Sequence, residues 1–164
     1  MPTYFFDTSA LAKYYIREQG SAWVIATIDD VSTSSDIIVA GITYAEMVAT
    51  FARLTREGRM AQVDGQVLAT AALRHFQLRK YQRRAISWQV IEEAGHLALT
   101  HAQAGQGLRG YDAVQLACAE LENQRLRLLG QSPLTFVTAD HRLFQIAVMI
   151  GLIVIDPATQ PQPK

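Results

Sequence analysis

The chain has 164 residues, and its 15 lysines and arginines balance its 15 aspartates and glutamates. This length favours a single domain, and a hydrophobic fraction of 49% excludes a disordered or fibrous chain. A net charge of zero argues against a nucleic-acid binder that works through a bulk positive field, and the single cysteine, Cys118, excludes an internal disulfide and a cysteine-rich zinc site.

Short apolar runs alternate along the chain with amphipathic stretches. In chain order, these patterns predict strand 3–6, helices 8–16 and 21–29, strand 37–40, helices 43–56 and 61–82 (one helix or two), strand 85–88, helices 89–103 and 111–123, strand 135–138, helix 140–150 and strand 152–155. Apolar strands that alternate with helices indicate an α/β fold with a parallel sheet of about five strands and right-handed crossovers.

The sequence predicts neither a signal peptide nor a membrane span. The N-terminus lacks the basic and apolar regions of a signal peptide, and no run of about 18 apolar residues could span a membrane. We therefore expect a cytoplasmic protein without membrane contact. Residues 157–164 are rich in proline, which removes amide donors, so we expect residues 1–156 to form the domain and 157–164 a flexible tail.

Four acidic residues occupy positions that a parallel sheet would bring together. Asp7 and Asp140 end predicted strands, where ligands bind in such sheets. Glu46 lies one turn into the helix after the second strand, and Asp112 opens a later helix. Both have apolar or aromatic neighbours, among which an unpaired carboxylate is rare.

Taken singly, each of these acids fits a helix cap, the commoner role for an acid at a helix N-terminus. Thr43 and Glu46 even match a capping box. Taken together, clustered carboxylates would repel one another unless a divalent cation neutralised them, and oxygen ligands favour Mg²⁺ or Mn²⁺ over zinc. Such a site activates water for phosphodiester cleavage.

Four segments in order resemble the motifs of one family. They read FFDTSALAKYY (residues 5–15), ITYAE (42–46), LRGYDAVQLA (108–117) and FVTADHRL (136–143), and the likeness runs over roughly residues 3–155. The chain resembles PIN domains, and VapC-type toxins in particular. The resemblance implies a three-layer α/β/α sandwich and a ribonuclease that depends on Mg²⁺ or Mn²⁺.

The resemblance also assigns roles to particular residues. It implies that Asp7, Glu46, Asp112 and Asp140 form an acidic catalytic quartet. Asp7, Asp112 and Asp140 would hold the metal, and Glu46 would hold or polarise the attacking water. Ser9 and Thr138 would be supporting hydroxyls, although each could instead cap a helix. Toxins of this type form homodimers and pair with a small VapB-like antitoxin, whereas other family members are RNA-processing nucleases and not toxins.

The zero net charge is the sum of regions of opposite charge, one of which is strongly basic. Residues 51–84 carry eight lysines and arginines against two acids, a net charge of +6. We expect Arg79, Lys80, Arg83 and Arg84 to hold RNA phosphates, with Tyr81 and Trp88 able to stack on bases. The alternative is a solvated helix face with its aromatic residues in the core.

Two rival functions remain open on the sequence. One is a phosphotransfer receiver with Asp7 as the phosphorylated residue, but such a domain needs a lysine after a later strand, and no lysine lies between Lys80 and Lys164. The other is a non-catalytic α/β binding module in which the four acids only cap helices.

Overall fold

Five short strands form a single parallel sheet. The computed structural model describes residues 2–30, 35–103, 105 and 107–161. The strands are β1 (Thr3–Phe6), β2 (Asp36–Ala40), β3 (Gln82–Arg84), β4 (Thr135–Val137) and β5 (Ile153–Ile155), in the spatial order β3-β2-β1-β4-β5. Each neighbouring pair is parallel. The predicted parallel sheet of about five strands is confirmed.

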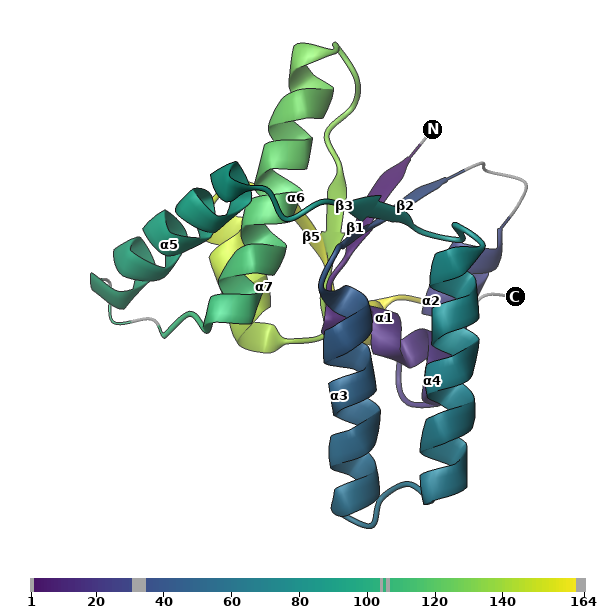
Figure 1. Ribbon diagram of the computed structural model, residues 1–164. Coiled ribbons are helices and arrows are strands. Elements are labelled where there is room, and N and C mark those ends of the chain that lie inside the picture. The colour runs from purple at the N-terminus through teal and green to yellow at the C-terminus, as the bar shows by residue number, and fades with distance from the viewer. Residues whose placement is uncertain (1, 31–34, 104, 106, 162–164) are drawn as a thin grey trace.

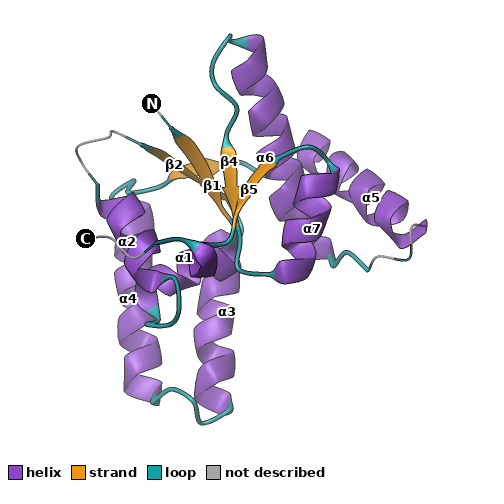
Figure 2. Ribbon diagram, turned by 180° about the vertical axis from the view of Figure 1, so that it is seen from behind, coloured by secondary structure: helices purple, strands orange, loops and turns teal. Residues whose placement is uncertain are grey.

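Helices cover both faces of the sheet (Figures 1 and 2). One face carries α1 (Thr8–Tyr15), α2 (Ser21–Asp29), α3 (Thr43–Arg56) and α4 (Gln62–Gln77), and the other carries α5 (Trp88–Gln103), α6 (Gly110–Leu128) and α7 (His141–Met149). The α3–α4 hairpin extends well beyond the sheet in both views. The architecture is the three-layer α/β/α sandwich that the family resemblance implied.

The strands are apolar throughout because both faces are covered. Successive side chains of a strand point to opposite faces, so Phe5 packs in the core under α5 and α6 while Phe6 packs in the core under α1 to α4. Phe5 also stacks on Phe136 of β4, with ring centroids 5.8 Å apart. Two separate cores therefore hold the central strand β1 in place.

The prediction of the third strand was wrong. We predicted a strand at residues 85–88, but the structure has β3 at Gln82–Arg84, and α5 begins at Trp88. β3 pairs with β2 on the edge of the sheet, and its first two side chains are exposed. A search for apolar runs misses such a polar edge strand. The predicted helix 61–82 ends at Gln77, two residues before Arg79 takes a positive φ of 57°.

The chain after β5 packs against α2. Residues Pro157–Thr159 form a short 3₁₀-helix, η1, and Pro157 is buried. Of the predicted tail, residues 162–164 lie outside the described residues. Within the described parts of the chain, no helix is long and apolar enough to cross a membrane.

The order of the strands determines where a ligand can bind. β1 lies between β2 and β4, so the chain leaves β1 to build one half of the sheet and later returns to build the other. In open parallel sheets, this change of direction opens a crevice beyond the carboxyl ends of the strands. Asp7 follows β1 directly, and Asp140 lies three positions after the end of β4.

Gly20 provides a test of the packing between η1 and α2. It has a φ of +87°, and a Cβ atom at this position would lie 2.7 Å from the carbonyl carbon of Pro157. Gly58 has a similar φ of +69° but open space around it. We expect G58A to cost about 1–2 kcal/mol of unfolding free energy from its backbone alone, and G20A at least about 1 kcal/mol more because backbone must shift. Urea unfolding of both variants measures the difference, and equal losses would contradict this packing.

Candidate active site

A cleft of about 830 Å³ opens at the carboxyl ends of β1 and β4. Residues of α1, α3 and α6 and of the turn after β4 line it. All four acids that the sequence singled out are among them: Asp7, Glu46, Asp112 and Asp140. The sheet topology thus brings together residues that lie up to 133 positions apart in the chain, between Asp7 and Asp140.

Asp7 is the one buried acid of the four, with 4% of its surface exposed. It is the N-cap of α1, and its Oδ1 accepts a 2.8 Å hydrogen bond from the Ala10 amide. Burial raises the pKa of Asp7 to about 7, because the charged form has lost its water, although hydrogen bonds from Ala10, Ser9 and Thr138 lower the pKa in part. The charge of Asp7 is therefore only partly compensated by the protein.

Two hydroxyl groups support this carboxylate. Ser9 Oγ lies 2.9 Å from both oxygens of Asp7, and Thr138 Oγ1 donates to Oδ2 at 3.0 Å. Each hydroxyl oxygen also accepts a backbone amide of the turn after β4, Ser9 from Ala139 at 2.9 Å and Thr138 from Asp140 at 3.1 Å. Ser9 and Thr138 thus connect the end of β1 to the end of β4 and fix the Asp7 carboxylate between them.

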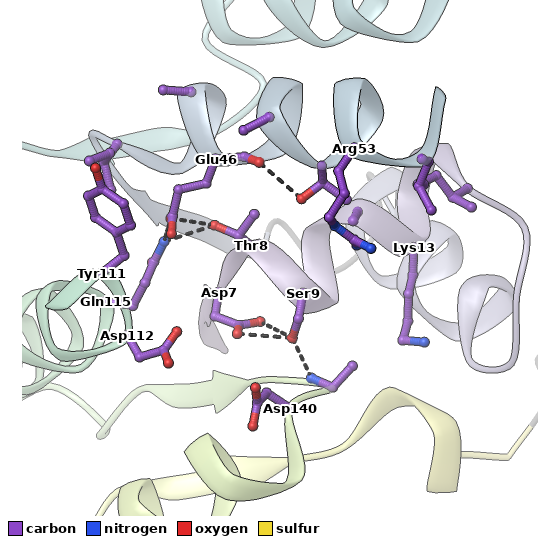
Figure 3. A pocket seen from close by; sticks show the side chains of 18 of the residues that line it. Asp7, Thr8, Ser9, Lys13, Glu46, Arg53, Tyr111, Asp112, Gln115 and Asp140 are labelled. Carbon is purple, nitrogen blue, oxygen red and sulfur yellow. Dashed lines mark hydrogen bonds between the residues drawn. The ribbon is translucent and has the colours of Figure 1, made fainter. Parts of the chain in front are cut away.

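Glu46 is held by side chains of two other helices (Figure 3). Its Oε2 accepts hydrogen bonds from the Thr8 hydroxyl at 2.7 Å and from the Gln115 amide at 2.6 Å. Gln115 Nε2 also lies 3.1 Å from the hydroxyl oxygen of Thr43. The capping box that the sequence suggested does not form, since α3 has Ile42 as its N-cap, without a side-chain cap. Glu46 instead faces the cleft.

Asp140 and Asp112 complete the acidic end of the cleft, and Figure 3 shows both carboxylates turned toward the space beside Asp7. Asp140 caps α7, and its Oδ1 accepts the amides of Arg142 and Leu143. Asp112 lies in the first turn of α6, 3.5 Å from the Arg142 guanidinium. Partial burial and then the charge of Asp140 raise the pKa of Asp112, and Arg142 opposes them.

The basic residues that the sequence offered for RNA lie elsewhere. None of Arg79, Lys80, Arg83 and Arg84 is among the residues that line the cleft. Lys80 pairs with Asp29, and Arg84 pairs with the buried Glu122 at 3.3 Å. Their contact with RNA stays a prediction. Tyr81 is 1% exposed and hydrogen-bonded to Tyr15, so the expectation that it stacks on bases is wrong, whereas Trp88 is 73% exposed.

The donor set of the cleft suits a hard divalent cation. Among the described residues, no three histidine, cysteine or acidic side chains already stand in place as ligands of one ion. Asp7, Asp112 and Asp140 nevertheless offer carboxylate oxygens to one space. Burial destabilises the charged forms of Asp7 and Asp112, and the charge of Asp140 adds to the effect on Asp112. Oxygen-only donors of this kind fit Mg²⁺ or Mn²⁺, so the residues present fit the predicted metal.

Three residues of the site were not found by sequence reasoning. Thr8 and Gln115 hold Glu46, and Arg142 pairs with Asp112. Gln115 carries a signal that could have been used, because it lies three positions after Asp112 on the same face of one helix. Arg142 follows Asp140 by two positions, and nothing in the sequence distinguishes it from an exposed arginine.

The chain is similar to a known family in sequence and to several solved structures in fold. The family model described as the PIN domain matches residues 4–149. A structure of FitAcB from Neisseria gonorrhoeae is 18% identical, covers 96% of this chain and 99% of its own, and has a TM-score of 0.67. VapC20 from Mycobacterium tuberculosis, described as a toxin that cleaves the sarcin-ricin loop, is 15% identical, with coverages of 96% and 99% and a TM-score of 0.60.

A third structure is VapBC-5 from Mycobacterium tuberculosis, described as a member of the VapBC family of toxin-antitoxin systems. It is 16% identical, covers 94% of this chain and 97% of its own, and has a TM-score of 0.55. At these identities the three structures show a common fold. No curated protein matches the sequence.

The Gln115–Glu46 hydrogen bond predicts a graded loss of stability. Q115M removes the donor at similar size, and we expect a loss of about 1–2 kcal/mol of unfolding free energy. Q115E places a second carboxylate against Glu46, and we expect a loss of about 3 kcal/mol at pH 8. Q124M removes a 3.4 Å hydrogen bond to Glu120 on the exposed side of the same helix and is the matched control. Urea unfolding measures all three, and a Q115E variant as stable as Q124M would contradict this role.

Proposed function

Because the chain belongs to the PIN domain family, we propose that it is an endoribonuclease that hydrolyses RNA phosphodiester bonds with Mg²⁺ or Mn²⁺. One observation carries the proposal: four carboxylates from separate elements line one cleft at the point where the sheet changes direction. A non-catalytic module would need the acids only as caps. Glu46 and Asp112 cap no helix in this structure.

In this proposal Asp7, Asp112 and Asp140 would hold the ion. A bound divalent cation supplies a polarised water and positive charge for the leaving oxygen. Other side chains orient the acids and balance their charge. Ser9 and Thr138 keep both oxygens of Asp7 in a fixed orientation. Arg142, 3.5 Å from Asp112, balances part of the negative charge that an approaching phosphate would meet.

Glu46 is the group that we assign to the attacking water. Its Oε2 is occupied by Thr8 and Gln115, so its orientation is set by α1 and α6 together and not by α3 alone. Glu46 lines the cleft across from Asp7 (Figure 3). A carboxylate fixed in this way can orient a water molecule and accept its proton as it attacks the phosphorus atom.

We further propose that the protein acts in the cytoplasm as the toxin of a toxin–antitoxin pair, as a homodimer that a VapB-like antitoxin blocks. The likeness to VapC20 and to VapBC-5 over nearly the whole chain supports a role of this kind. An RNA-processing nuclease that is not a toxin would use the same cleft. Growth arrest on expression, relieved by the product of a neighbouring antitoxin gene, would distinguish the toxin.

The receiver hypothesis finds little support around Asp7. Lys13 is the lysine among the residues that line the cleft, and it is 6% exposed. Its Nζ donates to Glu18 and to the carbonyl oxygen of Gln19. A receiver needs a lysine that reaches the phosphorylated aspartate, and this lysine is committed to the loop after α1.

The assignment of the acids predicts which variants lose activity. We expect D7N and D112N to lower the rate of RNA cleavage in Mg²⁺ by more than about 100-fold, since even the residues that orient metal ligands are worth 10–100-fold. Chelation by EDTA should have the same effect on the wild-type protein. Gel assays on single-stranded RNA measure the rates.

A matched control removes an acid outside the cleft. Asp64 is exposed on the first turn of α4, and D64N should cleave as the wild type does. Full cleavage by D7N, or cleavage by the wild type in EDTA, would contradict the metal-dependent mechanism. Circular dichroism of each variant checks that it is folded.

A further inference from the structure

The cleft continues well beyond the four acids, along the face of α3. Its lining runs from Glu46 past Ala49 and Thr50 to Arg53 and then to Arg59, in the connection to α4. Glu46 and Arg53 are seven residues apart, about 10 Å along the helix axis. A single nucleic-acid strand covers this distance within a few nucleotides. The cleft therefore has an acidic end and, two helical turns away, a basic end.

The wall between the two ends has no bulky side chain on α3. Ala45 and Ala49 are exposed one turn apart, and both line the cleft. The Thr50 hydroxyl is turned back onto the Glu46 carbonyl at 3.0 Å. A sugar-phosphate backbone can therefore approach this face of α3 closely. The volume of about 830 Å³ is that of a pocket for a drug-sized ligand, which fits a short stretch of one strand.

The basic end is made of two accessible guanidinium groups. Figure 3 shows Arg53 reaching from α3 across the cleft toward α1. The side chains of Arg53 and Arg59 are 47% and 66% exposed, and each directs its Nη1 at Glu57, at 3.2 and 3.4 Å. A guanidinium has five N–H donors. A phosphate can therefore bind to Arg53 and Arg59 either beside the Glu57 carboxylate or in its place.

Resting on the proposed function, we infer that a single RNA strand lies along α3, with the scissile phosphate at the four acids and neighbouring phosphates on Arg53 and Arg59. These two arginines are then the phosphate contacts that position the substrate. This assignment replaces a docking surface at residues 79–84, none of which lines the cleft.

The salt dependence of binding tests the inference. The probe is a short fluorescein-labelled single-stranded RNA with 2′-O-methyl riboses, bound in Ca²⁺ and checked on a gel to be intact. Each phosphate contact on a single strand contributes about 0.7 to the slope of log K against log salt. We expect the double variant R53Q/R59Q to lower that slope by about 1.4 and to weaken binding at low salt roughly tenfold or more.

A matched double variant removes the same charge outside the cleft. R79Q/R83Q changes two exposed arginines of the basic segment and should leave the slope within about 0.3 of the wild-type value, because non-contacting charges release few counterions. If R79Q/R83Q lowers the slope and R53Q/R59Q does not, the strand follows the basic segment and the inference is wrong.

Glu57 supplies a test of opposite sign. If it competes with phosphate for Arg53 and Arg59, then E57Q should tighten binding by roughly twofold to fivefold. D64N also removes one negative charge, but from a residue that does not pair with Arg53 or Arg59, and it should tighten binding less. Equal effects of E57Q and D64N would show that only net charge matters and would overturn the inference. A wild-type protein that binds RNA in this way but does not cleave it would refute the proposed function. The inference that the strand binds along α3 would still hold.

Discussion

The chemistry of the cleft depends on the buried carboxyl group of Asp7. It stands at the end of the central strand, between two cores that fix its position, and hydrogen bonds from Ala10, Ser9 and Thr138 only partly replace the water it has lost. A lone carboxyl group in this environment would retain its proton near neutral pH. Placed beside Asp112 and Asp140, it forms a set of oxygens whose charges the protein alone does not balance. This imbalance is the physical basis for expecting a cation in the cleft.

Capping and ligation are compatible roles for an acid in this fold. Asp7 caps α1, and Asp140 caps α7, because parallel strands end where the following helices begin. A carboxylate has about four acceptor sites, so a cap can still present oxygen to the cleft. Glu46 follows a different logic, since Gln115 and Thr8 fix it from α6 and α1. The geometry of the acidic end thus depends on how four separate elements are placed relative to one another. The two arginines at the far end lie along the same cleft, beside α3.

Periodicity and the positions of acids carried most of the sequence prediction. Apolar runs that are buried on both faces identify β1, β2, β4 and β5, and the acids beside three of their ends fall into one cleft. β3 was misplaced because Gln82 and Arg83 lie exposed on an edge, where burial leaves no pattern. The sequence shows the positive charge of residues 51–84 but not where each basic side chain lies in the fold. Arg53 reaches the cleft, whereas Lys80 and Arg84 form ion pairs outside it. Which arginines meet the cleft depends on tertiary contacts that a sequence pattern does not contain.

The most direct test of the cation site is the stability of the wild-type protein against pH, with EDTA and with Mn²⁺. Asp7 has a pKa of about 7 in the folded protein and an ordinary value of 3.8 when unfolded. Between these values the folded state holds a proton that the unfolded chain has released, so stability should fall as pH rises from about 4 to 7, by up to about 4 kcal/mol. Urea unfolding in EDTA should show this fall, and Mn²⁺ should reverse it at pH 8 in the wild type but not in D7N. A flat profile in EDTA, or equal stability with and without Mn²⁺ at pH 8, would contradict a cation site built on Asp7.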